Sequence, residues 1–255
     1  MPQLRAIIFD VDGTLADTER DGHRVAFNRS FAAAGLSWDW SVELYGTLLE
    51  VAGGKERIQF YIDRYNPPFE PPIAALKDWI ASLHAAKTAH YKQLLAEGII
   101  PVRSGVKRLL MEAKEQGLRL AIATTSTPDN VTALLKTTLA PDAPSWFEVI
   151  AAGDIVPVKK PAPDVYLYVL QKMALAPQHC LVIEDSYQGL QAALQARLKT
   201  VITLNNYTRH HDFSGATLVL SHLGEPDQGF EAIAGNPGNA TYFDLALAAW
   251  LLSKG

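Results

Sequence analysis

Two carboxylates separated by one residue stand directly after the first apolar run of the chain. The run covers 6–9, and Asp10 and Asp12 follow it, with Gly13 allowing a sharp turn. A carboxylate in such a place can attack phosphorus and carry it as an aspartyl phosphate. A second carboxylate can protonate the leaving oxygen and later activate water. The spacing therefore indicates a nucleophile beside an acid–base group, although two acids at a strand end can also simply cap the next element.

Hydroxyl groups and a lysine occupy two further positions of the same kind. Thr124, Thr125 and Ser126 follow the apolar run 120–123, and their hydroxyls and amides can hold phosphate oxygens. Lys160 comes just before a proline-rich helix start, where its charge can neutralise a phosphoryl group. Taken alone, the hydroxyls are more typical of a helix N-cap, and a single lysine is more typical of a solvated surface.

A further pair of acids, Glu184 and Asp185, follows the apolar run 180–183. Hard oxygen ligands at the tip of a strand suit Mg²⁺. Phosphate chemistry uses such an ion because it bridges and neutralises phosphoryl oxygens. The alternative is an acidic N-cap for the helix that follows.

Short strands and helices must position these four clusters. Short apolar runs recur along the chain at 6–9, 120–123, 180–183 and 200–203. Helical patterns separate them, as at Val106, Leu109, Leu110 and Ala113. This alternation predicts an α/β fold, a doubly wound parallel sheet with helices on both faces. Because sites in such sheets form at the carboxyl ends of the strands, the four clusters should converge on one edge.

The stretch 18–98 breaks this alternation. It contains no convincing strand, and a long helical pattern runs from Ile73 to Leu94. We interpret it as a helical cap inserted after the first strand into a core formed by 1–17 and 99–235. A C-terminal extension, 236–255, carries a short amphipathic helix that either docks on the core or meets a partner.

Composition limits the class of protein. The chain has 255 residues, 48% of them apolar, and a net charge of −4, so phosphate-driven binding to nucleic acid is not expected. The chain has no run of about 18 apolar residues, so no membrane partner is expected. We do not expect the run 6–9 to act as a secretory signal, because Asp10 and Asp12 interrupt it. The single Cys180 excludes an internal disulfide. We expect a monomer in the cytoplasm, or in the plastid stroma as a mature chain.

The order and spacing of the four clusters resemble the haloacid dehalogenase superfamily of phosphotransferases, over about residues 4–225. The resemblance implies a Rossmann-like core in which Asp10 is the nucleophile and a Mg²⁺ ligand. It implies that Asp12 is the acid–base group, with its backbone carbonyl on the metal. The other roles fall on the matching positions: phosphate binding on Thr124 and Lys160, and metal binding on Glu184 and Asp185. A threonine stands at 124, where this branch more often has serine.

The insert resembles the cap of the β-phosphoglucomutase-like branch, and its segments 17–24 and 53–58 look like the CbbY family. That family's implied activity is hydrolysis of xylulose 1,5-bisphosphate, an inhibitor formed by misfiring of Rubisco in the Calvin cycle. The implied substrate-facing residues are Glu19 and His23, and the distal phosphate would meet Lys55, Arg57 and Lys87. The free amides at Gly54 add a second anion-binding feature.

Other interpretations of the insert remain open. Residues 55–57 also suit a charged first helical turn in water, and His23 suits a core or capping histidine. A β-phosphoglucomutase-type phosphotransferase uses the same catalytic motifs. Another small-phosphosugar phosphatase, or a phosphosugar-binding regulator without catalysis, would also share much of this pattern.

Overall fold

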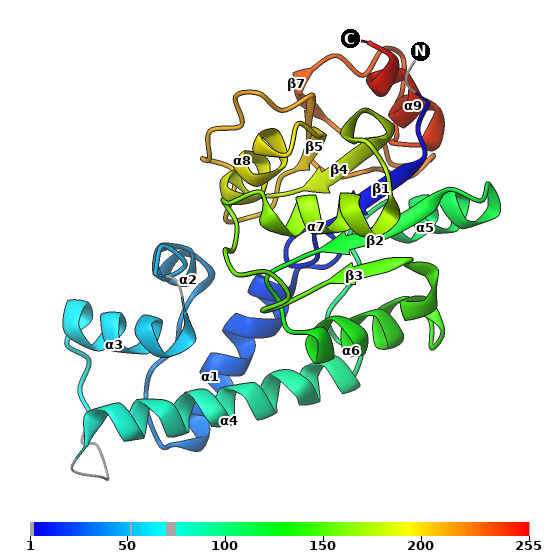
Figure 1. Ribbon diagram of the computed structural model, residues 1–255. Coiled ribbons are helices and arrows are strands. Elements are labelled where there is room, and N and C mark those ends of the chain that lie inside the picture. Colours follow the sequence, from blue (N-terminus) through cyan, green and yellow to red (C-terminus); the bar gives the residue numbers. More distant parts are fainter. Residues whose placement is uncertain (1–2, 52, 70–74, 255) are drawn as a thin grey trace. The chain divides into compact units, whose positions relative to one another are not determined.

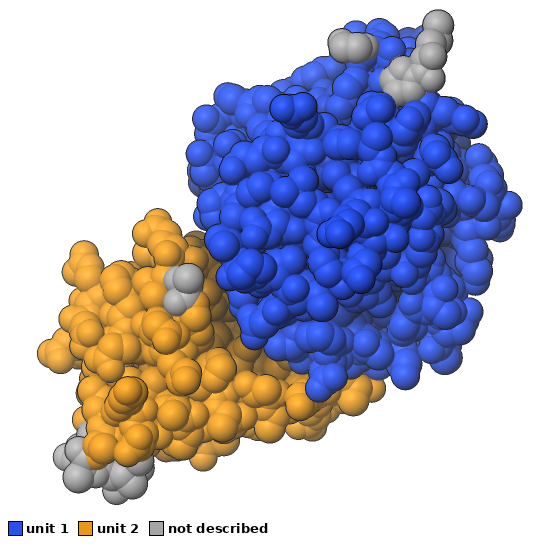
Figure 2. Space-filling view, in the orientation of Figure 1, with its two compact units in different colours: residues 1–17, 101–255 blue, residues 18–100 orange. Residues whose placement is uncertain are grey.

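The computed structural model describes residues 3–51, 53–69 and 75–254. The chain divides into two compact units, which Figure 2 shows in different colours. The sheet unit comprises 1–17 and 101–255, and the helical unit comprises 18–100. Within the described residues, no helix is both long and apolar enough to cross a membrane.

A seven-stranded sheet forms the centre of the sheet unit (Figure 1). Its order is β3-β2-β1-β4-β5-β6-β7, and every neighbouring pair is parallel except β6 and β7. The strands are β1 (Ala6–Phe9), β2 (Arg119–Ala123), β3 (Val149–Ala151), β4 (Cys180–Glu184), β5 (Lys199–Thr203), β6 (Leu218–Leu220) and β7 (Ala232–Gly235). The predicted α/β fold with a mainly parallel sheet is confirmed, and the four predicted strands are β1, β2, β4 and β5.

Helices cover both faces of the sheet. They are α5 (Val106–Glu115), α6 (Pro128–Thr138), α7 (Asp164–Met173), α8 (Tyr187–Gln195) and α9 (Leu245–Ser253), with short 3-10 turns at η2 (Ala143–Trp146) and η3 (Pro177–His179). Helix α7 packs against β2, β3 and α8, whereas α5 packs against β2 and α9. Helix α9 buries Leu247 and Leu251 against the core, so the intramolecular docking considered for this helix is correct. Phe243 is buried just before this helix begins.

The helical unit begins with a π-helical turn, η1 (Thr18–His23), followed by α1 (Arg24–Ala33), α2 (Val42–Leu48), α3 (Gly54–Tyr65) and α4 (Leu76–Ala96). No strand occurs in its described residues. Helix α1 packs along α4, and rings such as Phe27, Trp38, Trp40 and Tyr61 fill the interior. The expected helix start at Ile73 lies outside the described residues.

The two connecting segments between the units pair with each other inside the sheet unit. Ala16 and Val102 form an antiparallel bridge, and the backbone N–H of Arg103 donates to the carbonyl of Leu15 at 3.0 Å. The outgoing and returning chain are therefore held together beside the turn that follows β1.

Candidate active site

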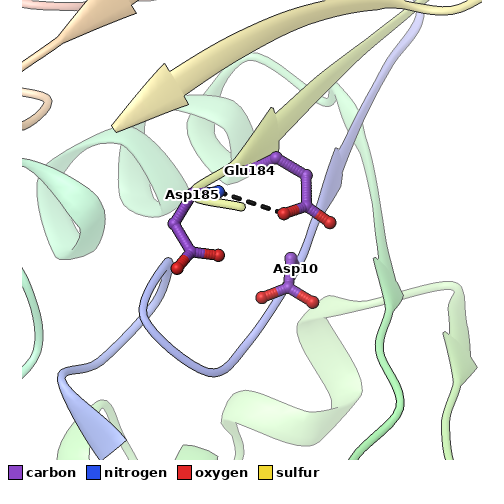
Figure 3. Close-up of side chains that lie close together, drawn as sticks. All are labelled: Asp10, Glu184 and Asp185. Carbon is purple, nitrogen blue, oxygen red and sulfur yellow. Dashed lines mark hydrogen bonds between the residues drawn. The ribbon is translucent and has the colours of Figure 1, made fainter. Parts of the chain in front are cut away.

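Three carboxylates meet at the carboxyl ends of two neighbouring strands (Figure 3). Asp10 follows β1, while Glu184 ends β4 and Asp185 comes directly after it. Phe9 and Ile183 are partners in the parallel ladder, so the next residues of both strands emerge side by side. One oxygen from each carboxylate lies within 4.8 Å of the others. The expected convergence of the β1 and β4 motifs therefore takes place.

Lys160 places an ammonium group among these carboxylates. Its Nζ donates to Asp10 Oδ1 at 2.8 Å, to Glu184 Oε1 at 2.6 Å and to the carbonyl of Ala123 at 2.8 Å. Burial acts to lower the pKa of Lys160, but the charges of Asp10 and Glu184 raise it well above its ordinary value. Lys160 thus stays charged and links the ends of β1, β2 and β4.

Excess negative charge remains after this pairing. Burial raises the pKa of Asp10 to about 8, with Lys160 opposing the rise and Glu184 and Asp12 adding to it. Burial also raises the pKa of Asp185 well above its usual range, and Glu184 and Asp10 raise it further. Clustered hard oxygens whose charges repel one another are a donor set that a divalent cation would neutralise. The residues therefore fit a divalent metal ion.

Glu184 is enclosed by hydrogen-bond donors. Its Oε1 accepts from Tyr166 Oη at 2.8 Å as well as from Lys160. Its Oε2 accepts from the backbone N–H of Asp185 at 3.0 Å and from the Ser186 hydroxyl at 3.2 Å. Burial acts to raise the pKa of Glu184, but the charge and hydrogen bonds of Lys160 and Tyr166 lower it. Glu184 is therefore held ionised and oriented towards Lys160.

The hydroxyl cluster after β2 lies beside Asp12. Ser126 Oγ donates to Asp12 Oδ2, and the backbone N–H of Ser126 donates to Thr124 Oγ1 at 3.1 Å. Thr124 is buried, whereas Thr125 is exposed. The structure thus brings Ser126 to the acid–base candidate and joins Thr124 to Ser126, and it places Thr125 on the surface of the same turn.

Three residues of this site were not identified from the sequence. Asn205 donates to Asp185 Oδ2 at 2.6 Å, Thr14 donates to Asp185 Oδ1 at 3.3 Å, and Tyr166 contacts Glu184. Asn205 follows the predicted strand at 200–203, so the rule about strand ends would have found it. Tyr166 lies within α7 and carries no comparable signal.

The helical unit contains a second polar centre. Lys87 Nζ lies 2.9 Å from Nδ1 of His23, and the His23 ring stacks on Tyr91 with a 3.9 Å centroid separation. Burial lowers the pKa of His23 well below its usual value, and the charges of Lys87, Arg57 and His84 lower it further. Because an ammonium only donates, the neutral imidazole must accept at Nδ1. The ring therefore directs Lys87 without neutralising it.

Arg57 is held by hydrogen bonds to its own unit and is linked to Glu19 through Tyr45. Its guanidinium donates to Tyr45 Oη at 2.9 Å and to the carbonyls of Leu48 and Val51 at 3.0 and 3.3 Å. Tyr45 in turn donates to Glu19 Oε2 at 2.6 Å. Arg57 and Glu19 are thus joined through one tyrosine, and much of the guanidinium is engaged with backbone carbonyls.

Gly54 and Lys55 form the first turn of α3. The preceding Gly53 supplies no side-chain cap, so the first amides of the helix have no side-chain acceptor at that position. A Cβ on Gly54 would lie 2.4 Å from His84 Nε2, so His84 packs directly on this turn. Lys55 is exposed, and its charge is one cause of the lowered pKa of His84 after burial and Lys87.

Comparison with known sequences places this site in context. A family model for haloacid dehalogenase-like hydrolases matches residues 4–197. The plasmid-encoded protein CbbY of Cupriavidus necator is 47% identical over 97% of this chain and 96% of its own length. A CBBY-like protein of Arabidopsis thaliana is 37% identical over 98% of this chain and 75% of its own length.

Solved structures of CbbY are also similar to this chain. CbbY from Rhodobacter sphaeroides, in complex with phosphate, superposes with a TM-score of 0.71 at 43% identity. The match covers 86% of this chain and 94% of that chain. The D10N mutant of the same protein, with the same TM-score, identity and coverage, is in complex with xylulose 1,5-bisphosphate.

Proposed function

Because the chain belongs to the haloacid dehalogenase-like hydrolases, and within them to the CbbY family, we propose that it is a magnesium-dependent phosphatase that acts on sugar bisphosphates. Its proposed substrate is xylulose 1,5-bisphosphate, and its proposed intermediate is an aspartyl phosphate. The observation that carries the proposal is the contact of Asp10 with Lys160 inside a buried cluster of carboxylates. The complex of the related R. sphaeroides protein supports the choice of substrate.

The geometry supports a two-step reaction at phosphorus. In the first step, a carboxylate oxygen of Asp10 attacks phosphorus, and the bond from phosphorus to the sugar oxygen breaks. Asp12 gives its proton to that departing oxygen. In the second step, Asp12 takes a proton from water, whose oxygen attacks phosphorus, so that inorganic phosphate leaves and Asp10 is restored. Ser126 holds Asp12 in place for both proton transfers.

Charge must be balanced around the phosphoryl group. Asp10, the backbone carbonyl of Asp12, Glu184 and Asp185 are the proposed magnesium ligands, and bound magnesium would supply the positive charge that neutralises phosphoryl oxygens. Lys160 supplies a fixed cation, and Thr124 supplies a hydroxyl donor. Water exclusion strengthens each of these interactions, since the participating groups are largely buried.

The helical unit is proposed to recognise the other end of the substrate. Lys87 is oriented by His23 and by its position over the rings of Phe27 and Tyr91, at 5.0 and 5.2 Å from their centroids. A directed ammonium of this kind suits a phosphate, as does the N-terminal turn of α3 at 54–55. Further proposed contacts are Glu19 and His23 with the sugar hydroxyls, Thr125 and Ser126 with the reacting phosphate, and Arg57 through its charge on the distal phosphate.

A substrate panel tests this proposal. Phosphate release with magnesium would be measured on xylulose 1,5-bisphosphate, ribulose 1,5-bisphosphate and β-glucose 1-phosphate. We expect a strong preference for xylulose 1,5-bisphosphate. Conversion of β-glucose 1-phosphate to the 6-phosphate without phosphate release would instead identify a phosphoglucomutase.

A pair of variants on α4 tests the assignment of the distal phosphate. Lys87→Met removes a charge-assisted hydrogen bond, so the KM for the bisphosphates should rise about tenfold or more. Lys92→Met, on the exposed side of the same helix, is the matched control and should leave KM unchanged. An equal loss on mono- and bisphosphates in Lys87→Met would contradict the assignment.

A further inference from the structure

Arg103 lies on the segment that returns from the helical unit, and its guanidinium reaches three other segments of the sheet unit. Its Nε contacts Asp17 Oδ1, on the outgoing segment, at 3.4 Å. Its Nη1 donates to the carbonyl of Gly13 and, at 3.2 Å each, to the carbonyl and hydroxyl of Thr203. Its Nη2 donates to the carbonyl of Leu204. The side chain is 8% exposed, so these contacts are shielded from water.

Two of these segments also touch Asp185. Leu204 precedes Asn205, whose amide donates to Asp185 Oδ2 at 2.6 Å. Gly13 has a φ of +84° and packs against the same pair. A Cβ at Gly13 would lie 2.4 Å from Asp185 Oδ2 and 2.6 Å from Asn205 Nδ2. The placement of Gly13 and Asn205 therefore determines where the Asp185 carboxylate can lie.

We infer that Arg103 is a positioning residue, which holds Asp185 in place for the metal through Gly13 and Asn205. Its contact with Asp17 joins this arrangement to the place where the two connecting segments pair. The inference rests on the proposed function, since that function assigns Asp185 to the metal. Arginine suits the role because its planar guanidinium offers five N–H groups in fixed directions. Lysine offers the same charge without this fork of N–H donors in fixed directions.

Magnesium binding by the full-length protein, measured by isothermal titration calorimetry, tests this without relying on turnover. Arg103→Lys keeps the charge and loses the fork, so the Kd for magnesium should rise about ten- to a hundredfold. Steady-state kinetics at saturating magnesium should show a lower kcat with little change in KM. Thr203→Val removes one acceptor of the fork and should raise the Kd by about threefold.

Arg108→Lys is the matched control. The guanidinium of Arg108 also forms a fork, to Glu225 at 3.1 Å and to the carbonyls of Gly224 and Phe243 at 2.8 Å. This fork fastens α5 to the segments that lead to α9. Its loss should lower Tm while leaving the magnesium Kd within about twofold of the wild-type value.

A double variant tests the route of the effect. If Arg103 acts through Asn205, then the double variant Arg103→Lys with Asn205→Ala should have a Kd for magnesium close to that of whichever single variant binds magnesium less tightly. An unchanged Kd in Arg103→Lys despite a lower Tm, or fully additive losses in the double variant, would overturn the inference. Wild-type protein that bound no magnesium would contradict the proposed function itself, which separates the two claims.

Discussion

Replacing Lys160 by methionine removes the ammonium group that contacts Asp10 and Glu184 at 2.8 and 2.6 Å. The side chains of all three residues are at most 10% exposed, so the two carboxylates would lose their partner in a place with little access to water. Removing one member of a buried ion pair costs about 3–5 kcal/mol. Methionine has similar length, so this cost reflects the unpaired charge more than a cavity. We therefore expect the free energy of unfolding to fall by that amount.

Urea unfolding followed by circular dichroism measures this difference. The buffer would contain a chelator, so that no bound metal compensates for the missing charge. Lys159→Met is the matched control, because Lys159 pairs with Asp154 at 2.9 Å while the two side chains are 51% and 91% exposed. Such a surface pair contributes less than about 1 kcal/mol.

A double variant checks that charge is the cause. Asp10→Asn removes one of the two unpaired carboxylates, so Asp10→Asn combined with Lys160→Met should recover part of the lost stability. Equal effects of Lys160→Met and Lys159→Met, or a loss below about 1 kcal/mol for both, would refute the electrostatic account of this centre.

Two further predictions concern packing and protonation. Gly189→Ala should lower the free energy of unfolding by about 1–3 kcal/mol and weaken magnesium binding, because the added Cβ would lie 1.9 Å from Glu184 Oε1. Thermal unfolding and magnesium titration measure the two effects, and a gain in stability would contradict the prediction. His23 should stay neutral at pH 6 in an NMR titration, since burial, Lys87 and Arg57 lower its pKa. The unfolded chain binds a proton on His23 near pH 6.5. Below that pH the free energy of unfolding of the wild-type protein should therefore fall by up to about 1.4 kcal/mol per pH unit relative to that of His23→Gln. Parallel profiles of stability against pH for the two proteins would disprove the lowered pKa of His23.

Much of the catalytic centre follows from local sequence patterns. Short apolar runs predict buried strands, and polar residues after such runs must meet where parallel strands end. For this reason the meeting of Asp10 with Glu184 and Asp185, far apart in sequence, follows from β1 and β4 being neighbours. The strands β3, β6 and β7 were not predicted, because each has only three or four residues and so gives too short a pattern to distinguish from a loop.

Side-chain contacts between distant segments could not be predicted in the same way. The fork of Arg103 depends on backbone carbonyls that the tertiary fold brings together, and carbonyls have no signature in the sequence. Arg57 illustrates the same limit, since its type and position suggested a phosphate ligand while its guanidinium bonds to the carbonyls of Leu48 and Val51. Contact of this chain's Lys87 with a distal phosphate stays a prediction.

Trapping of the proposed intermediate tests the central claim most directly. Borohydride reduces an acyl phosphate to an alcohol, so quenching the enzyme with borohydride during turnover of xylulose 1,5-bisphosphate should convert Asp10 to homoserine. Peptide mapping by mass spectrometry would locate the change, and enzyme without substrate would serve as the control. Reduction confined to Asp10 and dependent on substrate is the result we expect. Continued phosphate release with unmodified Asp10, or near-normal turnover by Asp10→Asn, would contradict the account.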